Sequence, residues 1–166
     1  MTKKFHWGIT QSVKIDCSVP KLWKIITTDS NLELFHPFCK KNKVIKWLGS
    51  ESIDEIQYLN GSVFRRKFCS WINEVGYDLY INQLNKPSSF VSWRLSEQED
   101  KSSITITVFP YLFNRGYKMV NFFPFFLVVR PLLSKYLSSV VGGLKLYAET
   151  DRQVEKNYFG KHLWFS

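Results

Sequence analysis

Cysteine is scarce in this sequence, and its few cysteines form no motif. Cys17, Cys39 and Cys69 are widely spaced, and no CxxC pair occurs. Zinc ribbons and dithiol redox centres need paired cysteines at short spacing, so the pattern argues against both classes. It predicts free, mostly buried thiols in a reducing cytoplasm.

Motifs for catalysis and for cofactor binding are missing as well. The sequence contains no G-x-S-x-G turn for a nucleophilic serine and no H-E-x-x-H metal motif. It also has no glycine-rich loop that would cradle a phosphate, which argues against a Rossmann cofactor. We therefore predict no cofactor and no catalytic metal.

The chain shows no internal repeat, low-complexity segment or linker. Its start, Met-Thr-Lys-Lys-Phe-His, lacks the continuous apolar core of a signal peptide. A chain of 166 residues is long enough for one domain with a real core. We expect that domain over residues 1–151, followed by a loosely ordered tail over residues 152–166, although the tail is unusually apolar.

The apolar stretch Met119–Leu133 lacks the continuity of a transmembrane helix. A span needs about 20 predominantly apolar residues, whereas polar or helix-breaking residues interrupt this stretch: Asn121, Pro124, Arg130 and Pro131. Peripheral contact with an anionic membrane stays open, because Arg115 and Lys118 precede the aromatic cluster Phe122–Phe126. The alternative is that these aromatic rings begin a core helix.

Acidic residues are fewer than basic ones, 14 against 23, which gives a net charge of +9. Such a charge favours an acidic partner, such as nucleic acid, an anionic membrane or an acidic protein. The basic residues stand in small scattered groups, and no nucleic-acid-binding motif organises them. A solvated basic surface explains them better than a nucleic-acid site, so nucleic acid is not an expected partner.

Aromatic residues are abundant, at 17% of the chain. They build large rigid surfaces, which occur both in cores and in the walls of ligand pockets. The composition alone leaves both interpretations open.

Hydrophobic periodicity predicts a mostly antiparallel α+β domain. Residues 5–17 alternate as a half-buried strand. Ser18 is placed to cap a helix, and Asp29 or Ser30 to cap a second short helix through Leu34. Six strands joined by short turns should then form a meander, at Val44–Leu48, Ile53–Leu59, Val63–Ile72, Tyr77–Leu84, Phe90–Leu95 and Ile104–Phe109.

The last regular element should be a long helix from about Pro131 to Asp151, because apolar residues repeat there at helical spacing. Pro124 and Pro131 should kink or delay its start. The Gly142–Gly143 pair costs helix stability, and it suggests that the sheet approaches the helix closely there. A curved sheet of about six to seven strands that grips one helix tends to leave a cavity between the two layers.

This order of elements resembles the helix-grip fold. The segment Val19-Pro20-Lys21-Leu22-Trp23-Lys24-Ile25-Ile26 is similar to the opening helix of the START-like (SRPBCC) superfamily, which includes polyketide cyclase-like and Bet v 1-like proteins. The segment Leu144-Lys145-Leu146-Tyr147-Ala148-Glu149 is similar to the end of its last helix. His36-Pro37-Phe38-Cys39, Trp47 and the run from Asp54 to Gly61 resemble a bacterial subgroup. The resemblance implies a cavity for a lipid, sterol, polyketide or other hydrophobic molecule.

Candidate site residues follow from these patterns. His36 is the best catalytic candidate, as a general acid or base in a loop at the cavity mouth, and the alternative is a structural histidine. Arg65 and Arg66 face opposite ways, so Arg66 could point inward and bind a carboxylate or phosphate head group, and the alternative is that both arginines lie on wet surfaces. Asp54 and Glu55 also diverge, which argues against paired-carboxylate chemistry. The remaining expected ligand-binding residues are apolar or aromatic: Trp7, Ile9, Phe35, Tyr58, Val91, Trp93, Phe109, Leu133 and Leu137.

Three functions remain open at this point. The first is a non-catalytic binder or carrier of a hydrophobic small molecule, cytoplasmic and peripheral to a membrane at most. The second is a cyclase, dehydratase or hydrolase that uses His36 as acid or base. The third is an interaction module whose basic face meets an acidic partner. Fold alone does not choose between them.

Overall fold

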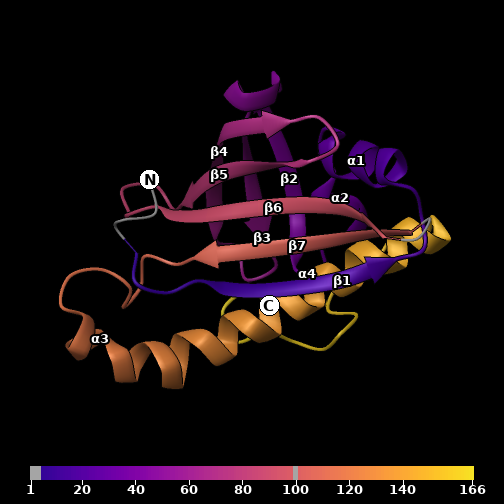
Figure 1. Ribbon diagram of the computed structural model, residues 1–166. Helices are drawn as coiled ribbons and strands as arrows, with labels where there is room; N and C mark the ends of the chain where they lie inside the picture. Colours follow the sequence, from indigo (N-terminus) through magenta and orange to yellow (C-terminus); the bar gives the residue numbers. More distant parts are fainter. Residues whose placement is uncertain (1–4, 99–100) are drawn as a thin grey trace.

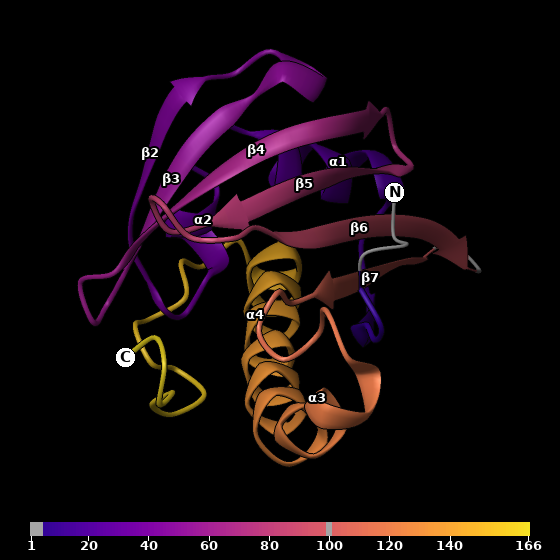
Figure 2. The ribbon, with the colours of Figure 1, turned by 90° about the vertical axis from the view of Figure 1, so that its left-hand side faces the viewer.

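One curved antiparallel sheet wraps around one long helix (Figure 1, Figure 2). The structure is a computed structural model that describes residues 5–98 and 101–166. In these residues seven strands lie in the order β1-β7-β6-β5-β4-β3-β2. Their bounds are β1 Ile9–Ile15, β2 Cys39–Lys46, β3 Ile53–Tyr58, β4 Val63–Ile72, β5 Gly76–Asn82, β6 Ser89–Gln98 and β7 Lys101–Phe109.

The sheet confirms the expected meander from β2 to β7. All six neighbouring strand pairs are antiparallel, and β1 closes the far edge against β7. The bounds of β4 are those expected, whereas β2 begins at Cys39 and not at Val44. The expected acidic turn Glu97–Lys101 includes positions that lie outside the described residues.

Two short helices connect β1 to β2 and cover one end of the sheet (Figure 1). In α1 (Val19–Thr27), the Ser18 hydroxyl accepts a hydrogen bond from the Lys21 N–H, as expected for a cap. In α2 (Leu32–Phe35), the expected caps Asp29 and Ser30 are wrong. The helix follows Asn31, whose backbone is already helical and whose side chain makes no capping hydrogen bond.

The C-terminal helix begins earlier than expected, at Lys118, and runs to Thr150. It consists of α3 (Lys118–Pro124), the wide π-helical turn η3 (Phe125–Val129) and α4 (Arg130–Thr150). The regular part expected from about Pro131 to Asp151 matches α4 within one residue at each end, whereas a delayed start is wrong for the helix as a whole, because α3 and η3 already continue it from Lys118. Each proline lacks a donor, and the wide turn between them re-spaces the backbone hydrogen bonds so that the chain continues as a helix.

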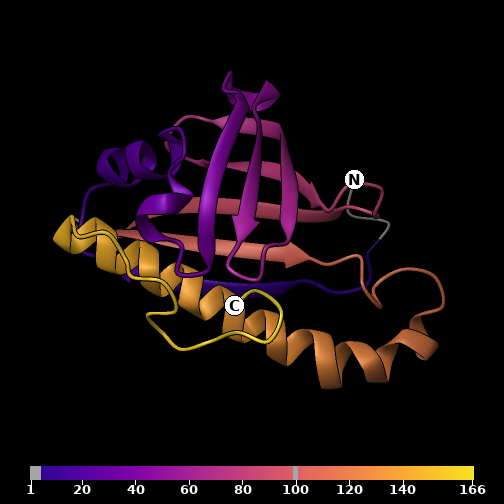
Figure 3. The same ribbon diagram turned by 180° about the vertical axis from the view of Figure 1, so that it is seen from behind.

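This helix is long and apolar enough to cross a membrane by length and composition alone. The core helix of a globular protein passes the same test, and 39% of the most apolar window of this helix is buried within the protein. Its α4 part lies along the concave face of the sheet beside β1, while its first turns project beyond the sheet edge (Figure 1, Figure 3).

The tail, residues 152–166, packs against the domain, which corrects the expectation of loose order. The Val154 and Asn157 N–H groups donate to the carbonyls of Leu34 and Pro37, each at 2.9 Å. His162 Nε2 lies 2.9 Å from the Leu132 carbonyl, and the Phe165 ring is buried. The apolar residues of the tail therefore serve to cover the start of β2 and one side of α4.

Gly143 is required by a close approach between α4 and α2, and not by the sheet as expected. A Cβ atom on Gly143 would lie 2.2 Å from the Phe35 carbonyl oxygen, a separation that only glycine permits. The contact fixes the end of α2 against the middle of α4. It thereby fixes the position of the next residue, His36.

Candidate functional site

A cavity of about 340 Å³ lies between the concave face of the sheet and α4. This volume falls within the range of small-molecule sites, about 300–1,000 Å³. Its wall is mostly apolar and comes from strands β3 to β7 and two of their turns, α2 and the residue after it, the helix η3–α4, the loop after β7 and the tail. Leu112 in that loop and Asn60 in the turn between β3 and β4 both line the cavity and are exposed, so the wall reaches the surface at these two places.

Seven of the expected site residues lie on the cavity wall: His36, Tyr58, Arg66, Val91, Trp93, Leu133 and Leu137. The strand residues reach it because alternate side chains share one face of a strand. The two leucines reach it because they lie one turn apart on α4. The role of these residues in binding stays a prediction, since no ligand is present.

Four expected residues do not line the cavity. Trp7 packs on the helix start, with its ring 4.8 Å from that of Phe125. Ile9 and Phe35 are buried in the core. Phe109 lies on the opposite face of β7, where its ring is 6.1 Å from Phe90.

The error at Phe109 is one of strand parity. Ile104, Ile106 and Val108 are buried on the concave face, and Val108 lines the cavity. Phe109 is the next residue, so it points to the other side of the sheet. Its bulk and aromatic character suggested a pocket residue, although the alternation of its own strand indicates the outer face.

Sequence reasoning missed many further wall residues, among them Tyr136, Trp164 and Phe165. Tyr136 lies three residues after Leu133 and four before Val140 on α4, so helical spacing could have identified it. Trp164 and Phe165 line the cavity from the tail, and no local pattern in the sequence indicated that.

His36 is buried, with 3% of its surface exposed, and not at the cavity mouth as expected. Its Nδ1 accepts a hydrogen bond from the Phe38 N–H at 3.2 Å, and its Nε2 lies 2.8 Å from the Tyr136 hydroxyl. Burial, reinforced by the charge of Arg66, lowers the pKa of His36 to about 3. The ring is therefore neutral near pH 7, with both nitrogens engaged, which disfavours a role as general acid or base.

The hydrogen bonds of His36 continue into a pair of tyrosines. The Tyr136 and Tyr58 hydroxyl oxygens are 2.9 Å apart. Burial raises the pKa of both phenols above the ordinary value. Both hydroxyls are thus protonated near neutral pH and can donate hydrogen bonds.

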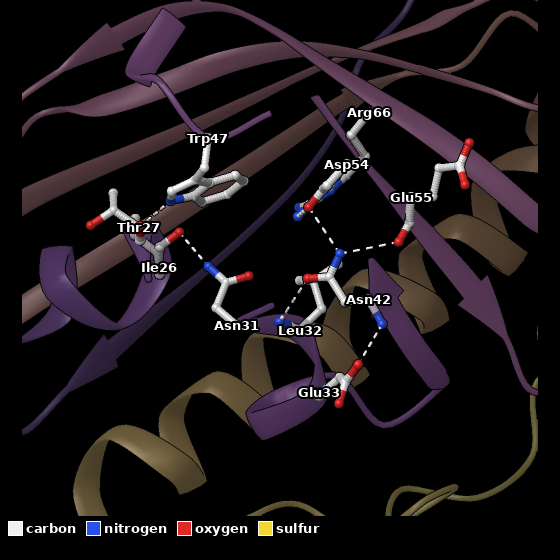
Figure 4. Close-up of polar contacts among 10 residues, drawn as sticks. All are labelled: Ile26, Thr27, Asn31, Leu32, Glu33, Asn42, Trp47, Asp54, Glu55 and Arg66. Carbon is white, nitrogen blue, oxygen red and sulfur yellow. Dashed lines mark hydrogen bonds and ion pairs between the residues drawn. The ribbon is translucent and has the colours of Figure 1, made fainter. Parts of the chain in front are cut away.

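Arg66 points inward but is already paired. Its Nε donates to Asp54 Oδ1 at 2.8 Å, and its Nη2 donates to Asp54 Oδ2. Asn42 Nδ2 also donates to Asp54 at 2.9 Å, which ties β2 to the ion pair (Figure 4). The opposite faces of the same strands carry the pair Arg65–Glu55, at 2.7 Å. The expectation that Asp54 and Glu55 diverge is confirmed.

The aromatic cluster Phe122–Phe126 divides between core and surface. Phe125 is buried, and the Phe126 ring lies 5.3 Å from the Trp7 ring. Phe123 is 68% exposed, as are several apolar neighbours on the projecting helix. The two interpretations of the cluster therefore each apply to part of it.

The described residues offer no group of three His, Cys, Asp or Glu side chains that could hold a metal ion. No family model matches the chain, and no curated protein matches it in sequence. Solved structures do match it in shape, at low sequence identity.

DynU16, from the dynemicin biosynthetic locus, superposes with a TM-score of 0.68 at 14% identity. The match covers 88% of this chain and 48% of that chain, so this protein spans about half of DynU16. CalU16 from Micromonospora echinospora superposes with a TM-score of 0.61 at 13% identity, over 87% of this chain and 77% of that one.

The crystal structure of Ara h 8.0201 gives a TM-score of 0.62 at 13% identity, over 86% of this chain and 97% of that one. Together with the seven-stranded sheet and the long C-terminal helix, these likenesses identify the architecture. The chain has the α+β helix-grip fold of START-like proteins.

Proposed function

We propose that this protein binds a hydrophobic small molecule in the cavity and acts as its carrier. The observation that carries the proposal is the cavity itself, whose wall is mostly apolar and includes the exposed residue Leu112. Burial of an apolar ligand in such a space is favourable at about 25 cal/mol per Å² of apolar area. The shared fold with polyketide cyclase-like and Bet v 1-like proteins supports this class of ligand.

A carrier is favoured over an enzyme by the state of His36. A general base must be able to take a proton near the working pH. The Phe38 N–H already occupies Nδ1, and burial holds the pKa of the ring far below neutral. His36 is better suited to hold Tyr136 in place than to exchange protons with a substrate.

The test is a fluorescence titration with diphenylhexatriene, a neutral hydrocarbon that emits strongly in apolar surroundings. Saturable one-to-one binding is expected. Leu133→Trp should reduce it at least tenfold by filling the cavity, whereas Leu48→Trp, on an exposed site away from the cavity, should not. Native mass spectrometry of protein purified from its host, with lipid extraction, would identify the natural ligand. Absence of saturable binding would exclude the carrier function.

We also propose that the carrier docks transiently on anionic membranes through the projecting end of the helix. Exposed apolar side chains gather there and define a docking face: Tyr117, Met119, Val120, Phe123 and Leu127. Arg115, Lys118 and Arg130 lie next to this face in the sequence, and residues 111–130 contain no Asp or Glu. Apolar contact and charge attraction together are the properties of interfacial helices.

In the sequence, the docking face lies between two residues that line the cavity. Leu112 lines the cavity just before the projecting helix, and Val129 lines it just after the docking face. A ligand could therefore pass between the bilayer and the cavity over a short path. The three free cysteines suit a cytoplasmic carrier that meets the inner face of a membrane.

Vesicle co-sedimentation tests this second proposal. Binding to phosphatidylserine vesicles should exceed binding to phosphatidylcholine vesicles and should weaken as salt is raised. Met119→Ser with Phe123→Ser should reduce it severalfold, while Leu48→Ser with Ile72→Ser, at exposed sites elsewhere, should not. Equal binding by both double variants would refute a docking role, and concentration-dependent dimers without vesicles would assign the face to a second copy of the chain.

A further inference from the structure

The hydrogen bonds around His36 run in one direction. The Phe38 backbone N–H donates to His36 Nδ1, so that nitrogen carries no hydrogen. A neutral imidazole then has its hydrogen on Nε2, which donates to the Tyr136 hydroxyl oxygen at 2.8 Å. The backbone of the segment after α2 thus fixes the tautomer of the ring and the direction of the next hydrogen bond.

The three side chains His36, Tyr136 and Tyr58 form a hydrogen-bonded series, and one of their hydrogens takes no part in its hydrogen bonds. His36 Nε2, the Tyr136 hydroxyl and the Tyr58 hydroxyl carry one hydrogen each. The two contacts between them, at 2.8 Å and 2.9 Å, use one hydrogen each. Among the described residues no other acceptor is in hydrogen-bond contact with either hydroxyl, so one phenolic hydrogen has no protein partner.

That remaining hydrogen belongs to a group on the cavity wall. Tyr58 and Tyr136 both line the cavity, one from the end of β3 and the other from α4. A buried donor without a partner is costly, so the site is stabilised when an acceptor occupies the adjacent space. The cavity is otherwise mostly apolar, and this donor is a polar group on its wall that no protein acceptor satisfies.

The cation nearest the tyrosines is already paired. The carboxylate of Asp54 accepts two hydrogen bonds from the Arg66 guanidinium, so the pair has no net charge, although Arg66 is the member that lines the cavity. His36 is neutral. An anionic ligand would be transferred from water into this space without an unpaired cation to meet it, which is unfavourable. A neutral acceptor such as a carbonyl oxygen avoids that cost.

We propose that the cavity selects neutral, largely apolar molecules that carry a carbonyl-type oxygen, and that Tyr58 and Tyr136 donate the hydrogen bond that orients this oxygen. His36 acts as a positioning residue for Tyr136. The inference rests on the proposed carrier function and narrows its ligand class.

Three probes that share one tricyclic ring system test the selection: fluorene, fluorenone and fluorene-9-carboxylate. Each is measured by displacement of diphenylhexatriene, which has no polar atoms. Fluorenone should bind about tenfold more tightly than fluorene. This ratio lies in the upper part of the range that the net free energy of one hydrogen bond provides. The carboxylate should bind less tightly than fluorenone.

The double variant Tyr58→Phe/Tyr136→Phe removes both hydroxyls and keeps both rings. Its preference for fluorenone over fluorene should fall to about twofold or less, because only the more distant His36 N–H remains as a donor. Tyr111→Phe is the matched control, since Tyr111 lines the same cavity and stands outside the hydrogen-bonded chain. Its ratio of the two affinities should equal that of the wild type.

An infrared measurement on the wild type alone guards against a variant that fails to fold. The carbonyl stretch of bound fluorenone should lie at lower wavenumber than in hexane, as for a hydrogen-bonded carbonyl. An unshifted band, equal affinities for fluorene and fluorenone, or a preference that survives in the double variant would overturn the inference. Tightest binding of the carboxylate would overturn the neutral-ligand part and assign the anchor to Arg66. If none of the three probes displaces diphenylhexatriene, they are not ligands of the cavity and the inference fails, while saturable binding of diphenylhexatriene would still support the carrier function.

Discussion

Acidification should destabilise this protein through His36, and substitution of that residue should remove the effect. The pKa of His36 falls from its ordinary value of 6.5 to about 3 in the folded state, chiefly because of burial. Between these values the unfolded chain binds a proton that the folded protein does not. The free energy of unfolding therefore decreases as the pH falls below about 6.5, and the loss is complete near pH 3.

The magnitude follows from the two pKa values. One proton of difference changes the free energy of unfolding by about 1.4 kcal/mol per pH unit. Integrated from pH 7 to pH 4.5, with pKa values of 6.5 and about 3, the loss due to His36 is about 2.5 kcal/mol. This is a large share of the stability of a typical domain.

Urea unfolding of the wild type and of His36→Gln, each at pH 7 and pH 4.5, measures this contribution. Glutamine can still accept from the Phe38 N–H or donate to Tyr136, and it does not titrate. Other titrating groups are present in both proteins, so their contributions to the pH dependence cancel in the comparison. One of them is His162, whose pKa is also lowered by burial. The wild type should lose about 2.5 kcal/mol more than the variant.

Two results would refute this reasoning. Parallel pH dependences of wild type and variant would mean that His36 keeps an ordinary pKa in the folded protein. Nitrogen NMR showing a doubly protonated imidazole in the folded wild type at pH 4.5 would mean the same. Either result would also remove the fixed tautomer on which the donor direction of Tyr136 depends.

Two other predictions concern the framework of the site. Asp54→Ala should lower the free energy of unfolding by about 3–5 kcal/mol in urea titrations, because Arg66 is left buried and unpaired. The double variant Asp54→Leu with Arg66→Met should regain most of that free energy. Equal losses in the single and the double variant would contradict the buried ion pair. Gly143→Ala should cost about 1–3 kcal/mol, because its Cβ would lie 2.2 Å from the Phe35 carbonyl oxygen. Gly142→Ala, whose Cβ would meet only the edge of the Phe159 ring at 3.0 Å, should cost less when the two variants are compared by urea titration.

The sheet could be predicted because its determinants are local. Alternation of apolar and polar residues identifies each strand, and short turns such as Asn60–Gly61 force neighbouring strands to pair antiparallel. The bounds of β4 were obtained in full for this reason. The parity of β6 likewise identified Val91 and Trp93 as wall residues, whereas attention to residue type over parity misplaced Phe109.

The start of the long helix could not be predicted from local rules. Proline normally ends or kinks a helix, and two prolines frame the π-helical turn. The buried side chains of Phe125 and Val129, which pack on the domain, stabilise that turn. Tertiary packing thus overrides the local preference, and no pattern within the segment indicates this.

The polar part of the site depends on contacts that are distant in sequence. His36 and Tyr136 are a hundred residues apart, and they meet because glycine at position 143 lets α2 approach α4. The sequence identified His36 as a candidate for chemistry from its residue type. Its burial and its two hydrogen-bond partners, which turn it into a positioning residue, follow only from the packing of the two helices.

The two proposals together define a direction for the bound molecule. Val129 and Tyr136 both line the cavity, and seven residues of helix separate them by about 10 Å. An oxygen held by the tyrosines leaves the apolar part of the ligand free to extend toward Val129 and Leu112, next to the docking face. A ligand that enters a bilayer from the protein does so most easily with its apolar part first, and this is the part that faces the docking face. A carrier on the membrane would thus release the apolar end first, while the last contact to break is the hydrogen bond to Tyr58 and Tyr136, which makes that bond the step most able to control exchange.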